Sequence, residues 1–197
     1  MKEKNYIKTV RYPPGDFAIW IVIYVELVTF GALFLTYAYK RHLDVELFNE
    51  SQLMLNQLAG FVNTIVLITS SYLVVRAVEI IKKDKMGVNF KQASNFLSGA
   101  IILGIVFLVI KISEFYSKYA EGINMSTNTF FMFYFILTVF HFLHVLLGVI
   151  ILYNLYAKTK TGGYNISNYA GLETGASYWH MVDLLWIVLF PLIYIIR

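Results

Sequence analysis

The chain has 197 residues, of which 58% are hydrophobic and 14% are charged. Soluble domains are usually about 45–50% apolar and about 25% charged, so this composition excludes an ordinary soluble domain and predicts a polytopic membrane protein. The absence of cysteine excludes disulfides, thiolate metal sites, iron–sulfur clusters and cysteine nucleophiles. The net charge of +4 does not indicate a nucleic-acid partner, because the basic residues lie at the ends of apolar segments rather than in a stripe.

Five apolar segments are long enough to cross a hydrocarbon layer of about 30 Å at 1.5 Å per helical residue. The first has no small-residue cleavage site after it, so we expect it to remain in the protein. We therefore expect an all-α bundle of five transmembrane helices that forms one domain over residues 1–197. A polar connection over residues 44–57 is predicted to be partly helical and interfacial. The predicted spans cover residues 17–39, 58–81, 93–116, 129–156 and 176–196.

Five spans place alternate connections on opposite sides of the membrane, so the positive charges predict the orientation. Eleven lysines and arginines fall on the side of the N-terminus and five on the other, which predicts a cytoplasmic N-terminus and an external C-terminus. The eleven are Lys2, Lys4, Lys8, Arg11, Arg76, Lys82, Lys83, Lys85, Lys91, Lys158 and Lys160, and the five are Lys40, Arg41, Lys111, Lys118 and Arg197.

The last predicted helix carries two ionisable residues, His180 and Asp183, between Trp179 and Trp186. Residues three apart lie on one face of a helix. An ionisable group at membrane depth costs roughly 2.5–3.5 kcal/mol or more, so it is retained only where it faces protein, water or a partner charge. We therefore expect this face to meet neighbouring helices.

Counting residues from the predicted helix ends places three polar side chains at similar depths. Glu26 lies about 15 Å from the cytoplasmic end of its helix, His144 about 14–18 Å and Asp183 about 11–12 Å. We predict that these three form a buried polar layer. Its supporting residues are His141, His180, Trp179, Glu173 and, near the outer boundary, Glu114.

Two interpretations of this layer remain open. The first is a structural clasp, since hydrogen bonds between transmembrane helices fix orientation although each contributes only about 0.6 kcal/mol. The second is a proton-handling site, since burial raises carboxyl pKa values towards neutrality.

A cofactor site is the further alternative. His141 or His144 together with His180 would place imidazoles on two helices, as in a bis-histidine haem cytochrome. The spacing argues against this, because His180 is expected several ångströms nearer the cytoplasm than His144. No Glu-x-x-His pairs for a dinuclear site are present on two helices. No catalytic triad order, P-loop or dinucleotide-binding turn is present either, so we predict neither catalytic residues nor metal ligands.

Four segments together resemble the subunit III family of the haem-copper oxidases. The final helix contains a Tyr-Trp-His-x-Val-Asp-x-x-Trp run after an acidic residue, and TVFHFLHVLLG resembles the family's His-x-x-His-Val-x-x-Gly helix. The segment KISEFY is similar to its Glu-bearing segment, and YVELVTFGALF to the helix with a buried reactive carboxyl. The four occur in the family's order and cover nearly the whole chain.

The resemblance implies an accessory subunit without redox centres of its own, packed against a catalytic subunit that carries haem and copper or iron. It implies support of that subunit's stability and proton uptake, with membrane lipids as further partners, bound phospholipid as a ligand and no nucleic acid. Glu26 would be the buried reactive carboxyl, with His144 and Asp183 as its polar companions.

The longer members of the family have seven helices, whereas five are predicted for this chain. Five-helix members include quinol-oxidase subunits and an accessory subunit of nitric oxide reductases. The amino-acid sequences of the last two helices and the presence of Glu26 favour the nitric oxide reductase type. The alternative is subunit III of a cytochrome c or quinol terminal oxidase. In either case the resemblance implies a bacterial-type cytoplasmic (inner) membrane.

Overall fold

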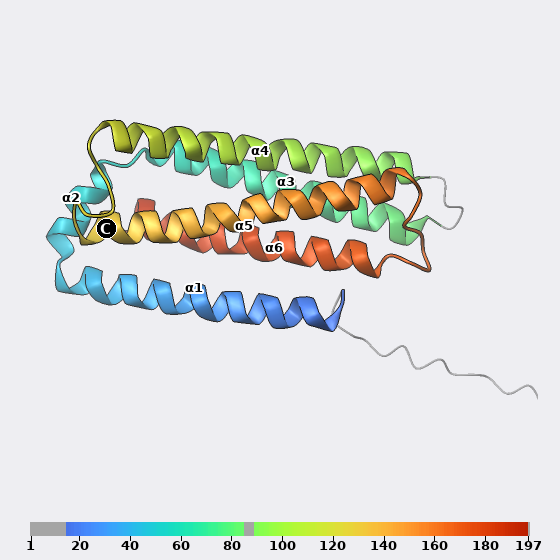
Figure 1. Ribbon diagram of the computed structural model, residues 1–197, viewed down its shortest axis with the longest axis horizontal. Coiled ribbons are helices and arrows are strands. Elements are labelled where there is room, and N and C mark those ends of the chain that lie inside the picture. Colours follow the sequence, from blue (N-terminus) through green and yellow to red (C-terminus); the bar gives the residue numbers. More distant parts are fainter. Residues whose placement is uncertain (1–14, 85–88, 197) are drawn as a thin grey trace, which may run out of the picture.

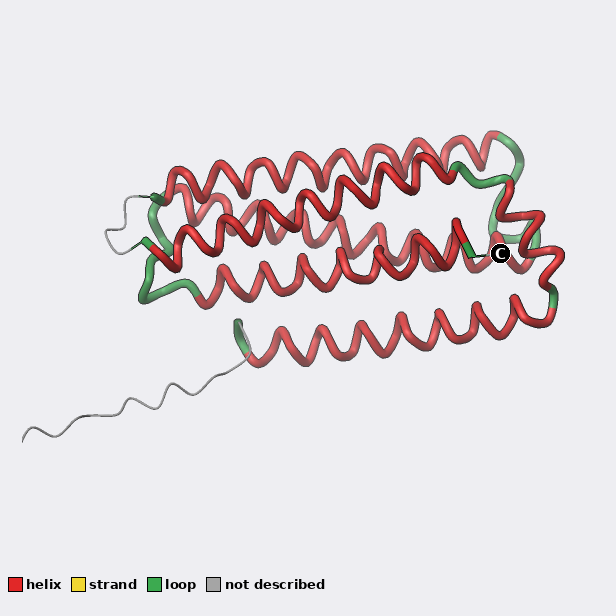
Figure 2. Tube along the Cα trace, turned by 180° about the vertical axis from the view of Figure 1, so that it is seen from behind, coloured by secondary structure: helices red, strands yellow, loops and turns green. Residues whose placement is uncertain are grey.

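The protein is a bundle of long, nearly parallel helices (Figure 1). The computed structural model describes residues 15–84 and 89–196. Six of the charges that were counted to predict the orientation lie outside the described residues: Lys2, Lys4, Lys8, Arg11, Lys85 and Arg197. Helices and their connecting loops make up the trace in Figure 2. The helices are α1 Phe17–Leu43, α2 Val45–Leu53, α3 Gln57–Lys83, α4 Phe90–Ala120, α5 Thr129–Lys160 and α6 Ala170–Phe190, followed by a short π-helix, η1 Pro191–Ile195.

The prediction of five apolar helices is confirmed, since α1, α3, α4, α5 and α6 with η1 are each long and apolar enough to cross a membrane. The remaining helix, α2, falls within the polar connection after α1. The helices run past most of the predicted ends, because polar residues at a membrane boundary continue a helix as readily as apolar ones. Lys111 was counted among the charges of a connection, and this was wrong: it lies inside α4, which continues to Ala120, and it is completely buried.

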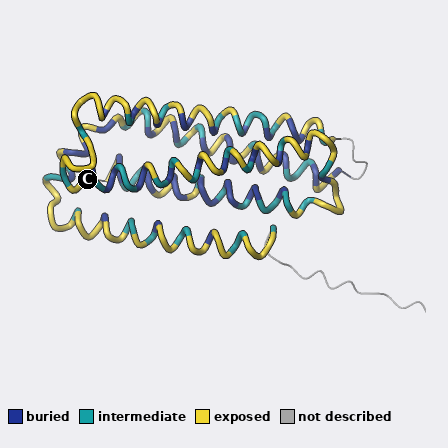
Figure 3. Tube along the Cα trace, in the orientation of Figure 1, coloured by how far each residue is buried: buried dark blue, intermediate teal, exposed yellow. Residues whose placement is uncertain are grey.

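Four helices form the core of the bundle. Helices α3, α4, α5 and α6 pack around one another in a ring, with contacts α3–α4, α4–α5, α5–α6 and α6–α3. Helix α1 lies at the edge and packs against α5 and α6 (Figures 1 and 2). Figure 3 shows that α1 is largely exposed, whereas α6 is buried along much of its length. The buried residues of α1 are Ile23, Phe30 and Tyr37, a narrow seam with a spacing of seven.

Trp179 is wedged between two glycines of neighbouring helices. A Cβ atom on Gly148 of α5 would lie 2.7 Å from Trp179 Cε3, and one on Gly104 of α4 would lie 2.9 Å from Trp179 Cη2. The indole is 1% exposed. Small residues at these positions let three helices approach closely enough for van der Waals packing, which holds membrane helices together where lipid offers no hydrophobic drive.

The prediction that follows concerns Gly148→Val. The added side chain would collide with Trp179, so we expect a loss of about 1–3 kcal/mol in the free energy of unfolding, measured by denaturation in mild detergent. Gly31→Ala in α1 is the matched control, because a Cβ atom at Gly31 would meet nothing within 4 Å. Equal stability of the two variants would contradict the packing.

Candidate functional site

The predicted polar layer contains a direct contact between α1 and α5. Glu26 Oε2 lies 3.1 Å from His144 Nε2, with the two side chains 23% and 11% exposed. The two atoms lie within ion-pair distance, but Glu26 Oε2 has no hydrogen-bond partner of acceptable geometry. Glu26 lies between Ile23 and Phe30 on the seam of α1 that faces the bundle. This contact therefore attaches the most exposed span to the core.

His144 is held in place by its own helix and by two phenylalanines. Its Nδ1 is 2.8 Å from the carbonyl oxygen of Phe140. Phe140 and Phe30 pack edge-on against the imidazole at 4.6 Å and 5.5 Å between ring centroids. Both ring nitrogens therefore face oxygen atoms, and the ring cannot turn without losing these contacts.

Asp183 does not join this pair, although the predicted layer grouped it with Glu26 and His144. It interacts with Ser71 of α3 and with His180. The Ser71 hydroxyl lies 2.6 Å from His180 Nδ1. His180 and Asp183 do share one face of α6, but that face meets α3, on the other side of α6 from the Glu26 contact.

Tyr178 is the α6 residue that reaches the Glu26–His144 contact. Its hydroxyl donates to the carbonyl oxygen of His144 at 3.4 Å. Sequence analysis did not single out Tyr178, and no sequence signal marks it. The structure places it at the surface of α5, where a Cβ atom on Gly148 would lie 3.5 Å from Tyr178 Cε1.

His141 lies in the centre of the core, fully buried. Its ring stacks on Trp186 at 5.2 Å between centroids, and both of its nitrogens are without hydrogen-bond partners among the described residues. A bis-histidine haem site through His144 would require breaking the Glu26 contact and the contact with Phe140. Within residues 15–84 and 89–196, no three His, Asp or Glu side chains are grouped so as to hold a metal ion.

The supporting residue Glu173 pairs with Lys82 and so joins α6 to α3. The side chain of Glu173 is 13% exposed and that of Lys82 is 42% exposed. Glu173 lies in the first turn of α6, directly after the α5–α6 loop, and Lys82 lies in the last turn of α3. Glu173 is thus a link at the rim of the core rather than a member of the layer.

A second polar cluster, which sequence reasoning missed except for Glu114, lies towards the other end of the bundle. Glu114 Oε1 accepts from the hydroxyls of Tyr134 at 2.7 Å and Tyr194 at 2.5 Å. Glu114 Oε2 accepts from Lys111 Nζ at 3.1 Å, and the same ammonium donates to Tyr194 Oη at 2.8 Å. We call these four residues the outer cluster. Four aromatic rings surround the ammonium at 5.1–5.5 Å: Phe115, Tyr134, Trp186 and Tyr194.

The π-helix next to the outer cluster is tied to three other helices. A helix leaves its last carbonyl groups without internal partners. Here the carbonyls of residues 192–194 accept hydrogen bonds from Tyr37 of α1 at 3.3 Å, Gln52 of α2 at 2.9 Å and Gln57 of α3 at 2.9 Å. The end of the described chain therefore joins α1, α2 and α3 to the cluster on α4 and α5.

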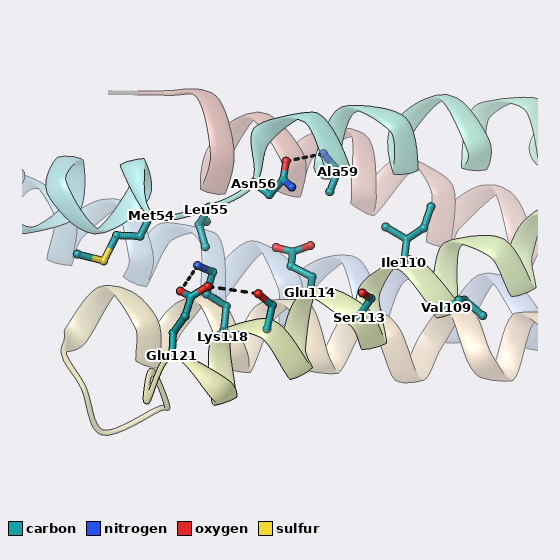
Figure 4. Close-up of a pocket in the computed structure, with 11 residues that line it drawn as sticks. Met54, Leu55, Asn56, Ala59, Val109, Ile110, Ser113, Glu114, Lys118 and Glu121 are labelled. Carbon is teal, nitrogen blue, oxygen red and sulfur yellow. Dashed lines mark hydrogen bonds and ion pairs between the residues drawn. The ribbon is translucent and has the colours of Figure 1, made fainter.

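A groove of about 680 Å³ opens beside the outer cluster, between the start of α3 and the end of α4. Figure 4 shows Glu114 projecting from α4 towards it, with Lys118 about one helical turn and Glu121 about two turns further along. Lys118 Nζ donates to Glu121 Oε2 at 2.6 Å. The groove is therefore lined by both apolar and charged residues.

These features define a multi-pass membrane protein in which two pairs of ionisable groups within the spans, Lys111 with Glu114 and Glu26 with His144, contact one another. The chain belongs to the cytochrome c oxidase subunit III family, whose profile matches residues 16–197.

Individual relatives are similar over a shorter stretch. Cytochrome c oxidase subunit 3 of Thermostichus vulcanus is 36% identical over 73 residues, which cover 36% of this chain and 36% of that relative. The protein of the same name from Synechocystis sp. is 38% identical over 73 residues, 36% of this chain and 31% of its own length. That from Lumbricus terrestris is 41% identical over 61 residues, 31% of this chain and 24% of its own length. The aligned stretches thus span about a third or less of these relatives.

The outer cluster yields a prediction for stability. Lys111→Met or Glu114→Gln alone leaves a buried group without its partner, so we expect each to lower the free energy of unfolding by about 3–5 kcal/mol in mild detergent. The double variant removes both charges and should lose less than the sum of the two.

Arg76→Gln is the matched control, because Arg76 and Glu79 form an exposed pair of the same spacing, 3.2 Å apart. Breaking it should change stability by at most about 0.5 kcal/mol. Single variants of the outer cluster that behave like this control would show that the buried pair contributes nothing.

Proposed function

We propose that this chain is a non-catalytic integral subunit of a haem-copper respiratory oxidoreductase. The observation that carries the proposal is the family match over residues 16–197. In this proposal haem and copper or iron reside in the partner subunit, and this chain supports the stability and proton uptake of that subunit. The complex would lie in a bacterial-type cytoplasmic membrane, with the N-terminus of the chain on the cytoplasmic side.

Polar side chains of the spans that contact other side chains of the same chain support an accessory role. The Glu26–His144 contact and the outer cluster both join helices of the same chain, and His144 already has an oxygen atom facing each ring nitrogen. The apolar surface of α1, by contrast, is largely exposed and offers area for packing against lipid or another membrane subunit.

The names of the relatives and the resemblance of the last two helices favour different substrates for the complex. The relatives compared above bear the name cytochrome c oxidase subunit 3, which favours an oxygen-reducing partner. The likeness of the last two helices to the nitric oxide reductase accessory type favours a nitric-oxide-reducing one, and a quinol oxidase is the third form. Subunit III of a haem-copper complex is common to all three.

The test is purification of the chain from its native membrane in mild detergent. We expect it to co-purify with a large subunit that shows haem absorption, and the complex to reduce oxygen or nitric oxide. Recovery of the chain as a lone species would overturn the proposal. A Soret band in the isolated chain that disappears in His144→Ala would instead establish the haem-binding cytochrome.

Glu26→Gln tests the role of the layer within such a complex. The amide removes the charge that faces His144, so the contact between α1 and α5 should weaken. A contact of about 0.6 kcal/mol corresponds to roughly a threefold change in an equilibrium constant. We expect a roughly threefold shorter half-life of activity during turnover, with little change in the initial rate.

Glu79→Gln serves as the control for this measurement, because Glu79 lies at the rim with its side chain 43% exposed. A loss of the initial rate in Glu26→Gln, with no effect on half-life, would favour proton handling by Glu26 over a structural contact. Full activity and an unchanged half-life would show that Glu26 is dispensable.

A further inference from the structure

Two polar side chains at the centre of the bundle differ from the other polar residues of the core. Asn63 of α3 and His141 of α5 are both 0% exposed, and both polar atoms of each side chain are without a hydrogen-bond partner among the described residues. A neighbouring core residue, Ser70, does have one, since its hydroxyl donates to the carbonyl oxygen of Ala100 at 2.9 Å. Buried polar groups in proteins are nearly always hydrogen-bonded, either to protein or to ordered water.

The contact between α3 and α4 places Asn63 level with Phe107. The hydrogen bond from Ser70 to Ala100 fixes where these two antiparallel helices meet. Residues seven apart lie on the same face of a helix, so a step of seven back along α3 and forward along α4 leads from this pair to Asn63 and Phe107. Both are 0% exposed and therefore face the interior of the ring of helices.

The contacts of Trp186 in α6 place His141 at the same level. Its Nε1 donates to the hydroxyl of Thr64 at 3.0 Å, and Thr64 is the residue next to Asn63. The His141 ring packs on Trp186 and on Phe107, at 5.2 Å and 5.8 Å between centroids. All four core helices thus contribute one of these side chains at a single level.

Asn63 and His141 face each other across the ring. The contacts α3–α4, α4–α5, α5–α6 and α6–α3 put α3 and α5 at opposite corners. Neighbouring helix axes are 8–10 Å apart in packed bundles, so opposite axes are about 11–14 Å apart. The two side chains are therefore directed towards a common centre without bonding to each other.

The hydrogen-bonding capacity at this centre is mixed. The amide of Asn63 offers two donors and one acceptor, and a neutral imidazole offers one of each. Lys111 is close enough to His141 to interact with it electrostatically. Two of the three N–H groups of Lys111 donate to Glu114 and Tyr194, so these bonds leave one N–H. A metal cation would be repelled by the ammonium and an anion could not use the acceptors, whereas water both donates and accepts.

We propose that ordered water binds between Asn63 and His141 at the centre of the bundle. The water accepts from the Asn63 amide and from Lys111, and it donates to the acceptor nitrogen of the imidazole. The site extends the outer cluster inward, from Glu114 to His141. It goes beyond the proposed function and does not depend on the identity of the partner subunit.

X-ray radiolytic labelling tests the site in the complex as the native membrane yields it. Ionised water forms hydroxyl radicals that add to adjacent side chains, so a buried ring is labelled quickly only where water is bound beside it. Phe107 and Phe130 are both 0% exposed, but Phe107 packs on His141 and Phe130 packs on Phe48 and Phe131. We expect mass spectrometry to show that Phe107 is labelled several-fold faster than Phe130.

Two variants remove the partners of the water. Asn63→Leu replaces the amide by an apolar side chain of similar size, and His141→Phe keeps an aromatic ring but removes both nitrogens. Each should slow the labelling of Phe107 to the rate of Phe130. Asn154→Leu is the matched control, because it makes the same replacement at an exposed position of α5, and it should leave the rate of Phe107 unchanged.

The folding of each variant is checked by thermal unfolding in mild detergent, and only folded variants are compared. Slower labelling of Phe107 in either Asn63→Leu or His141→Phe supports the site. The proposal is overturned if Phe107 is labelled as slowly as Phe130 in the wild type, or if every folded variant keeps the fast rate. If neither variant folds, the comparison of Phe107 with Phe130 in the wild type decides.

Discussion

The buried ion pair between Lys111 and Glu114 is the interaction on which the arrangement of the bundle depends. Hydrocarbon cannot solvate either charge, so the pair is tolerated only because protein groups surround it. The two tyrosine hydroxyls that complete the set come from α5 and from the π-helix after α6. Three parts of the chain must therefore meet correctly before the charges on α4 are satisfied. The carbonyls of that π-helix in turn receive side chains from α1, α2 and α3.

The opposite half of the bundle is held by different forces. There the close packing of Trp179 against Gly104 and Gly148 brings α4, α5 and α6 together, and the rim contact between Lys82 and Glu173 joins α3 to α6. Helix α1 contributes no residue to the outer cluster itself or to the packing of Trp179. It has a narrow apolar seam, the Glu26–His144 contact and the hydrogen bond from Tyr37, which makes it the span whose position depends most on a few polar contacts.

Much of the fold could be predicted from sequence, because long apolar runs specify spans by length alone. The contact of Glu26 with His144 also agrees with the depths obtained by counting residues. Asp183 was grouped with them because depth says nothing about direction: its face of α6 turns to Ser71 on α3, and a single sequence does not reveal which neighbour a helix face meets. Tyr134 and Tyr194 were missed for a related reason, since tyrosines near helix ends usually lie at the membrane boundary, and only the three-dimensional arrangement turns these two towards Glu114.

The central claim is that the ionisable groups of the membrane spans serve the packing of this chain within a larger redox complex. A cryo-electron microscopy map of the assembly purified from native membrane tests it most directly. The account predicts a haem-bearing large subunit beside this chain, no haem density within it, and the carboxylate of Glu114 enclosed by Lys111, Tyr134 and Tyr194. Haem density between α5 and α6, or Glu114 turned towards the acyl chains, would contradict it.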